Sequence, residues 1–218
     1  MFNYPFCITP ATFSPVNTED VQLWIRSNIV SEVGLLQRLI DGAVDQFFND
    51  TQGYVLCSSS WQLNLDNWNY HWNRTGDGFV PYEMLLVEPE FVLGHPPQVF
   101  IPIAPVTSIT SVQYLDTNGN WDELTGWTAD TSTTPCRIIL PTNLPMLYAF
   151  SLPRIQIQFV AGNAEHNVPA LASQAVLGLV AHWYTNREST GDELDSLPHG
   201  WDSICGRFRT GINVSWNR

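Results

Sequence analysis

The segment from Val168 to Arg209 constrains the fold more than any other part of this 218-residue chain. Pro169 is favoured in the first turn of a helix, and Asn167 can cap that helix. Apolar side chains then recur at helical spacing, on one face, at Val168, Ala172, Ala175, Val176, Leu179 and Trp183. Beyond Pro198 the same spacing returns, at Trp201, Ile204, Cys205 and Phe208. The segment therefore predicts two amphipathic helices that close a hydrophobic core.

A second pair of helices is expected near the N-terminus. Asn17 or Thr18 caps a helix over 18–28, and two acids fall in its first turn, where they suit the positive end of the helix dipole. A wide apolar stripe predicts a longer helix over 31–50, which ends before a glycine. Residues 1–16 contain three prolines and no periodicity, so we expect an extended arm there.

The sequence between the two helix pairs has the period of β-strands. Trp61, Leu63 and Leu65 alternate with polar residues, as in a strand with one buried face. Asn118-Gly119 tolerates positive φ and predicts a hairpin turn. Further strands are expected over 99–103, 107–115, 121–124, 137–140 and 154–160.

The expected fold class is therefore α+β. It is a small helical bundle, with two N-terminal and two C-terminal helices, into which an antiparallel β block is inserted. The expected parts are an N-terminal arm (1–16), a helical core (17–53 and 163–209), a β-rich subdomain (54–162) and a C-terminal arm (210–218). Within the β-rich part, residues 67–97 are punctuated by Gly, Pro and Asn, and we expect a long loop or insertion there.

The charge balance limits the possible partners. The net charge is −12, and all nine basic residues are arginines. Phosphate binding needs clustered cations, so this chain is a poor candidate for wrapping nucleic acid. An acidic surface is instead compatible with DNA that slides past without binding.

Residues able to do chemistry are scattered. The four cysteines lie far apart and the five histidines form no motif. Nucleophile, phosphate-loop and zinc-protease motifs are missing from the sequence. We therefore expect no enzymatic activity, no cofactor and no metal site. The N-terminus does not read as a secretory signal, and no stretch approaches the about 20 apolar residues of a membrane span, so we expect no membrane association.

Several stretches, in order, resemble the head–tail connector (adaptor) proteins of tailed bacteriophages. In the N-terminal half these are EDVQLWIRSN and EVGLLQRLIDGAVDQFFNDTQGYVL, which resemble the first two helices of the family. The β region contributes WQLNLDNW and PIAPVTSITSVQYLDTNGNWDEL. The C-terminal half contributes RIQIQFVAGNAEHNVPALASQAVLGLVAHWY, then AHWYTNRES followed by an acidic loop and LPHGWDSICGRFR. Residues 1–16 and 67–97 match less well.

The resemblance implies a structural protein of the virion neck, assembled in the host cytoplasm. Such proteins form a dodecameric ring below the portal protein, extend the DNA channel, pass DNA without reading its sequence, and offer the docking surface for the tail or stopper protein. A closed ring requires a heterologous interface on every subunit. Another neck or tail-completion protein is the alternative within virions.

Two charged segments suggest roles within such a ring. The acids of the loop between the C-terminal helices are hypothesised to line the channel and repel the DNA backbone; they are Glu188, Asp192, Glu193 and Asp195. From Pro198 onward there are three arginines and one acid, against the acidity of the whole chain. We hypothesise that this C-terminal arm docks on the portal, where it could add a strand to an exposed sheet edge. The residues of the arm in this role are Arg207, Arg209, Ile212, Val214, Trp216 and Arg218.

An aromatic cluster in the 67–97 region has two readings. Trp68, Tyr70 and Trp72 form either a contact surface or a small satellite core. As a contact surface they would also suit stacking on sugars, which leaves a carbohydrate-binding tail module as an alternative function. The sequence does not choose between these readings.

Overall fold

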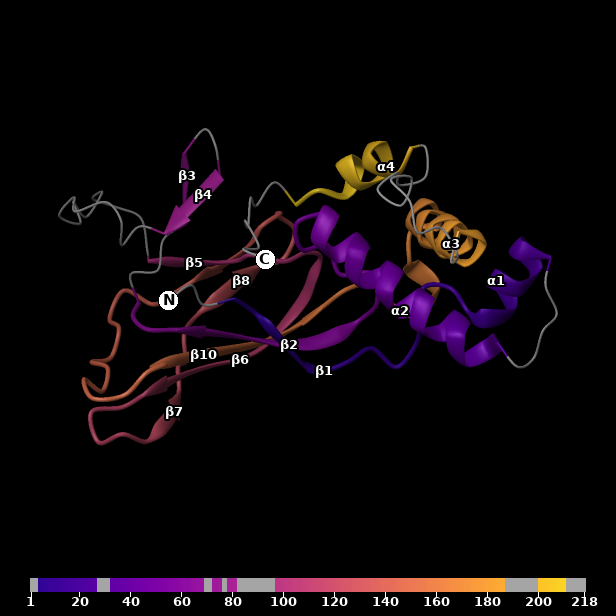
Figure 1. The fold of residues 1–218 in the computed structure, drawn as a ribbon. Helices are drawn as coiled ribbons and strands as arrows, with labels where there is room; N and C mark the ends of the chain where they lie inside the picture. Colours follow the sequence, from indigo (N-terminus) through magenta and orange to yellow (C-terminus); the bar gives the residue numbers. More distant parts are fainter. Residues whose placement is uncertain are drawn as a thin grey trace.

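A computed structural model describes residues 4–26, 32–68, 97–186 and 200–210, together with the backbone of 72–75 and 78–81. The helices gather at one end of the molecule and the sheets at the other (Figure 1). The fold is α+β, with a β block between two pairs of helices, as the sequence predicts. Among the described helices, none is long and apolar enough to cross a membrane.

Four helices form the bundle: α1 (Thr18–Ile25), α2 (Val33–Asp50), α3 (Ala170–Thr185) and α4 (Trp201–Phe208). Asn17 caps α1 as expected, because its side-chain oxygen accepts the backbone N–H of Asp20 at 2.7 Å. The buried apolar stripes of α2 and α3 meet in one hydrophobic core that also holds Trp201 and Cys205 of α4. Burial of these stripes stabilises the bundle, since short helices are marginal alone.

The start of α3 differs from the prediction. Pro169 takes the N-cap position with extended backbone, so the helix begins at Ala170. Asn167 belongs to the preceding short 3-10 helix, η3 (Glu165–Asn167), and the N-cap of α3 has no side-chain hydrogen bond. The expected Asn167 cap is therefore wrong, because the 3-10 turn places that residue before the helix entry.

The larger sheet is antiparallel, with strand order β1-β2-β10-β6-β7. Its strands are β1 (Phe6–Thr9), β2 (Ser59–Leu65), β6 (Val106–Leu115), β7 (Trp121–Glu123) and β10 (Ile155–Ala161). Burial alternates along β10 with the period of a half-buried strand. The hairpin predicted at Asn118-Gly119 joins β6 to β7, and Gly119 has a φ of +85°.

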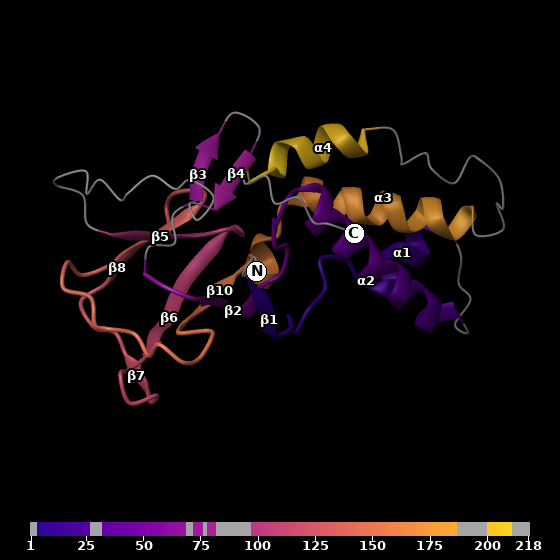
Figure 2. The same cartoon turned by 60° about the vertical axis from the view of Figure 1, so that its left-hand side comes forward.

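A smaller antiparallel sheet packs against the first, with order β5-β9-β8. Its strands are β5 (Gln98–Ile101), β8 (Thr128–Asp130) and β9 (Cys136–Ile139). One hydrophobic core holds buried residues of both sheets, among them Leu63, Ile157, Val99 and Ile138. The β part is thus a sandwich with its own core, next to the core of the helical bundle (Figure 2).

Four strands lie where the sequence analysis has none. Residues 6–9 of the expected arm pair with β2 as the edge strand β1, although all four side chains are exposed. β8 is three residues long, too short for a periodic signal. In the expected loop, β3 (Trp72–Thr75) pairs with β4 (Gly78–Pro81). Local pattern fails for β1 and β8 because their side chains are mostly exposed, and backbone pairing defines both strands.

The two cores are joined where the chain passes between them. The passage from α2 to β2 lies beside the passage from β10 to α3. Asn163 donates its backbone N–H and its side-chain amide to Leu56 O, at 3.2 and 3.0 Å, and accepts the N–H of Ser58 at 2.9 Å. Gly162 lies so close that a Cβ there would fall 2.3 Å from Cys57 O.

Substituting Gly162 tests this junction. Its φ of +102° is disfavoured for other residues, and the added methyl group would collide with the backbone of Cys57. We expect Gly162→Ala to destabilise the fold by more than about 2 kcal/mol in a denaturant melt. Gly178→Ala in α3 is the control, because a Cβ there meets nothing within 4 Å and alanine favours helix. Equal stability of the two variants would contradict the role given to Gly162.

Candidate interaction surfaces

The described residues show no candidate metal site, and the buried thiols are not reactive ones. They include no group of three or more His, Cys, Asp or Glu side chains placed to hold a metal ion. Burial raises the pKa of the Cys57 and Cys136 thiols to about 11, and that of Cys205 to about 12. Such thiols stay protonated at neutral pH and are poor nucleophiles. The features that remain are surfaces.

Helix α4 is fixed on the end of α2 by aromatic packing. Trp201 is 2% exposed and meets Phe47 edge-on, with ring centroids 5.9 Å apart. Phe208 packs on Phe47 at 5.6 Å and on Tyr54 at 5.0 Å. Edge-on and tilted aromatic pairs of this kind stabilise by about 1 kcal/mol each beyond their buried area.

The Asp50 carboxylate adds a polar tie to this packing. The Trp201 indole Nε1 donates to Asp50 Oδ2 at 2.7 Å, and the Gln46 amide donates to both carboxylate oxygens at about 3 Å. Hydrogen bonds to a charged acceptor are stronger than neutral ones. Asp50 therefore joins the last turn of α2 to the first turn of α4.

The chain after α4 is held to the same place. Thr210, 7% exposed, donates its hydroxyl to Gln52 O at 2.7 Å and its N–H to Thr51 O at 3.2 Å. Arg209 Nε donates to Asp50 O at 3.4 Å. Of the residues predicted to dock on the portal, Arg207 and Arg209 are exposed, and Ile212, Val214, Trp216 and Arg218 lie outside the described residues. The predicted arm thus begins at a fixed point beside the end of α2.

Trp68 is a core residue, which corrects the reading of the aromatic cluster as a contact surface at this position. It is 8% exposed, its ring lies 6.0 Å from that of Tyr114, and its Nε1 donates to Pro145 O at 3.0 Å. Local pattern does not show this contact, because Pro145 lies 77 positions away from Trp68 in the sequence. Tyr70 and the side chain of Trp72 lie outside what the structure describes, as do the acids Glu188, Asp192, Glu193 and Asp195.

The segment 141–154 between β9 and β10, here called the tip loop, exposes three large apolar side chains, while Leu144 and Leu147 pack against the β core. Met146, Phe150 and Leu152 are 79, 88 and 61% exposed. An exposed cluster of this kind is uncommon on a monomer and typically marks an interface. The sequence analysis does not identify this surface, because these apolar residues lie between prolines without the periodicity of a strand or a helix. Large apolar residues in a segment without periodicity are the one sequence signal that could have identified it.

Hydrogen bonds fix the backbone of the tip loop. Besides the Trp68 indole on Pro145 O, Tyr148 N–H donates to Leu115 O at 3.1 Å. Arg154 donates to Ser151 O and Ala149 O, each at 3.2 Å. The exposed side chains are therefore held outward by an ordered loop.

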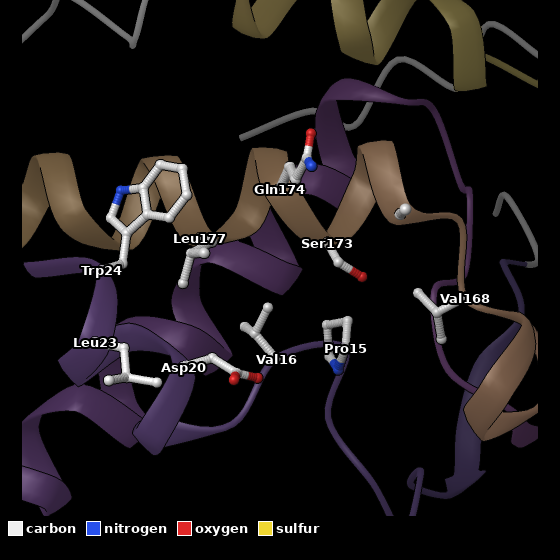
Figure 3. A pocket seen from close by; sticks show the side chains of 10 residues that line it. Pro15, Val16, Asp20, Leu23, Trp24, Val168, Ser173, Gln174 and Leu177 are labelled. Atoms are coloured by element: carbon white, nitrogen blue, oxygen red, sulfur yellow. The ribbon is translucent and has the colours of Figure 1, made fainter.

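A groove of about 630 Å³ lies between α1 and α3 (Figure 3). Leu23 and Trp24 of α1 are 75 and 57% exposed on one wall, Leu177 of α3 lies on the other, and Val16 is buried at the base. The acid Asp20 is also part of the lining. The groove, here called the α1 groove, is thus mainly apolar with a carboxylate in its wall.

Comparison with known proteins finds structural similarity only. No family model matches the chain, and no curated protein is significantly similar in sequence. A chain in the neck of an empty GTA (gene transfer agent) particle, computed with C6 symmetry, has a TM-score of 0.70 at 20% identity over 100% of both chains. A chain in the virion of a native GTA particle has a TM-score of 0.68 at 21% identity over 94% of both.

A third chain, in the neck of a native GTA particle computed with C12 symmetry, has a TM-score of 0.59 at 21% identity. It covers 97% of this chain and 99% of the other. These matches show that the fold is shared over nearly the whole chain.

Trp201→Phe tests the tie to Asp50. Phenylalanine keeps a ring against Phe47 but removes the indole donor from the carboxylate. We expect a loss of about 1.5–3 kcal/mol in unfolding free energy, the range for a hydrogen bond to a charged group. Trp121→Phe is the matched control, because Trp121 is 42% exposed, and it should change stability by less than about 0.5 kcal/mol. A loss no larger than the control's would argue against the tie.

Thiol labelling tests the placement of the cysteines. Cys7 is exposed and Cys57, Cys136 and Cys205 are buried with raised pKa values. A disulfide reagent at pH 8 should therefore modify one thiol of the native chain quickly and all four in guanidinium. Cys7→Ser should abolish the fast reaction. Rapid modification of two or more thiols in the native protein would be inconsistent with this arrangement.

Proposed function

We propose that this chain is a structural protein of the neck of a phage-like particle, an adaptor that forms a ring below the portal. The ring extends the DNA channel and provides the docking site for the tail or stopper protein. The observation that carries the proposal is the likeness, over the whole chain, to chains of GTA particle necks computed with C6 and C12 symmetry.

The charge of the chain suits a DNA passage. Each copy contributes a net charge of −12, so a ring of copies, most simply a dodecamer, is strongly acidic. Like charge keeps the DNA backbone from binding and allows it to slide. We assign the channel lining to Glu188, Asp192, Glu193 and Asp195, from their position in the sequence between α3 and α4.

The C-terminal arm is the proposed portal contact. Its base is fixed beside α2 by Thr210, and Arg207 and Arg209 are exposed next to that base. Ile212, Val214, Trp216 and Arg218 continue the arm with alternating apolar and polar residues. A fixed base lowers the entropy lost when the arm binds.

Trp68, the first of the three aromatic residues proposed to bind a sugar, is not available for that role. Stacking on a sugar needs an exposed ring face, and Trp68 is buried in the β core of this structure. We therefore place the protein in the neck rather than among receptor-binding tail modules.

Mass photometry of the purified chain, alone and with portal rings from the same genome, tests the proposal. We expect about a dozen copies to load on each portal ring. A chain that binds no portal, under conditions in which both proteins are folded, would overturn the adaptor role. A free ring that ignores portal would assign the protein to a different position in the neck.

Deleting residues 211–218 tests the proposed arm and keeps Thr210, whose hydrogen bonds belong to the fold. We expect the truncated chain to melt like the full chain and to lose portal binding. Arg207→Glu should weaken binding most at low salt, since exposed charges are screened as salt rises. Arg38→Glu, the same charge change on the exposed side of α2, is the control. Undiminished binding by the truncated chain would exclude the arm as the contact.

A further inference from the structure

Two apolar surfaces of the subunit lie at its opposite ends. The tip loop belongs to the β end and the α1 groove to the helical end, and both views show these ends far apart (Figures 1 and 2). A single copy therefore cannot cover its own groove with its own tip. Three of the most exposed large apolar side chains of the described residues are in the tip loop, and Leu23 and Trp24 are at the groove.

We propose that the tip loop of one copy fills the α1 groove of the next copy in the ring. This inference rests on the proposed function, because it names the contact between ring neighbours. Two different surfaces that bind each other form a heterologous interface, and such interfaces close into rings when the rotation between copies permits. The same chain thus supplies both partners.

The tip loop has the properties of an interface anchor. Phe150 is a large aromatic side chain, 88% exposed, and its ring lies 5.6 Å from that of Tyr148. Four hydrogen bonds fix the loop backbone at Pro145, Tyr148, Ala149 and Ser151. An ordered loop loses little conformational entropy on binding, and aromatic anchors carry much of the affinity of interfaces.

Charge also favours this pairing. Residues 141–154 contain one arginine and no acid, although the chain as a whole has 21 acids. The groove side presents Glu19 and Asp20 in the first turn of α1, and Asp20 lines the groove. Two copies of such an acidic chain repel each other through their net charge of −12 each. Because the tip loop has no acid, it can contact the Asp20 side of the groove without like-charge repulsion.

A cross-link between copies tests the contact directly. Both chains carry Cys7→Ser, which removes the exposed thiol. One preparation adds Ser151→Cys, next to Phe150 in the tip loop, and the other adds Gln174→Cys in the groove lining, so both anchors are kept; the two are mixed on portal rings with a short bismaleimide. We expect a covalent dimer in the mixture and none in either preparation alone. A chain with Phe6→Cys replaces the groove partner as control, because Phe6 is 47% exposed on β1 and lies outside the groove.

Loading on portal rings gives the second readout. Phe150→Ser and Leu23→Ser change exposed side chains, so their thermal melts should match wild type, which circular dichroism checks. We expect each to need at least about tenfold more protein to complete a ring on the portal, as for loss of an interface anchor. Phe6→Ser should load normally.

The outcomes separate this inference from the proposed function. If wild type and both serine variants complete rings equally well and the cross-link is absent, the tip–groove contact is wrong and the adaptor role stands. If wild type binds no portal, the adaptor role fails, and the cross-link in free solution then decides the contact: a specific dimer supports it, and no dimer overturns it.

Discussion

The backbone pairing of Leu56 and Ser58 with Asn163 is the contact on which the rest of the structure depends. It closes the base of the β block, where the chain leaves α2 and returns to α3. Each side of the junction has its own hydrophobic core, and neither core shares buried residues with the other. The close approach at Gly162 joins them through main chain, and Phe48 of α2 stacks on Trp61 of β2 with ring centroids 5.7 Å apart. The helical and β parts are thus joined by both backbone and side-chain contacts.

The joined helical and β parts place different surfaces at the two ends of the subunit. The helical end carries the α1 groove. The Asp50-centred attachment of α4, from which the C-terminal arm leaves, lies at the end of α2 that joins the β block. The β end carries the tip loop, supported from within by Trp68 and the β6–β7 hairpin. A buried indole thus helps to position an exposed phenylalanine. In a ring, surfaces held at a fixed separation on every copy can repeat the same contact around the axis.

The sequence predicts the helices and the longer strands because periodic burial defines them. Leu63 and Leu65 in β2 are buried as their spacing indicates, as are Ala172, Ala175, Val176 and Leu179 of α3. Prediction is incomplete where a distant contact decides. For Trp68 the sequence leaves open a contact surface or a core, and the hydrogen bond to Pro145 belongs to a buried indole. Phe6 to Thr9 form a strand by pairing with the edge of β2. The exposed apolar residues of the tip loop are not predicted for a related reason, since the sequence pattern does not show which apolar residues of a loop are exposed to solvent.

The proposed site is predictable in part for the same physical reasons. Arg207 and Arg209 stand out in an acidic chain by composition alone, and both are exposed. The groove and the tip loop require the fold, because α1 and α3 are far apart in sequence. The fold is shared with chains of GTA particle necks.

A cryo-electron microscopy reconstruction of the neck in particles encoded by the same genome tests the central claim most directly. The account predicts a ring of copies of this fold immediately below the portal, around the DNA path. Density for this chain at another position, such as the distal tail or a fibre, or as isolated copies with no ring, would contradict it.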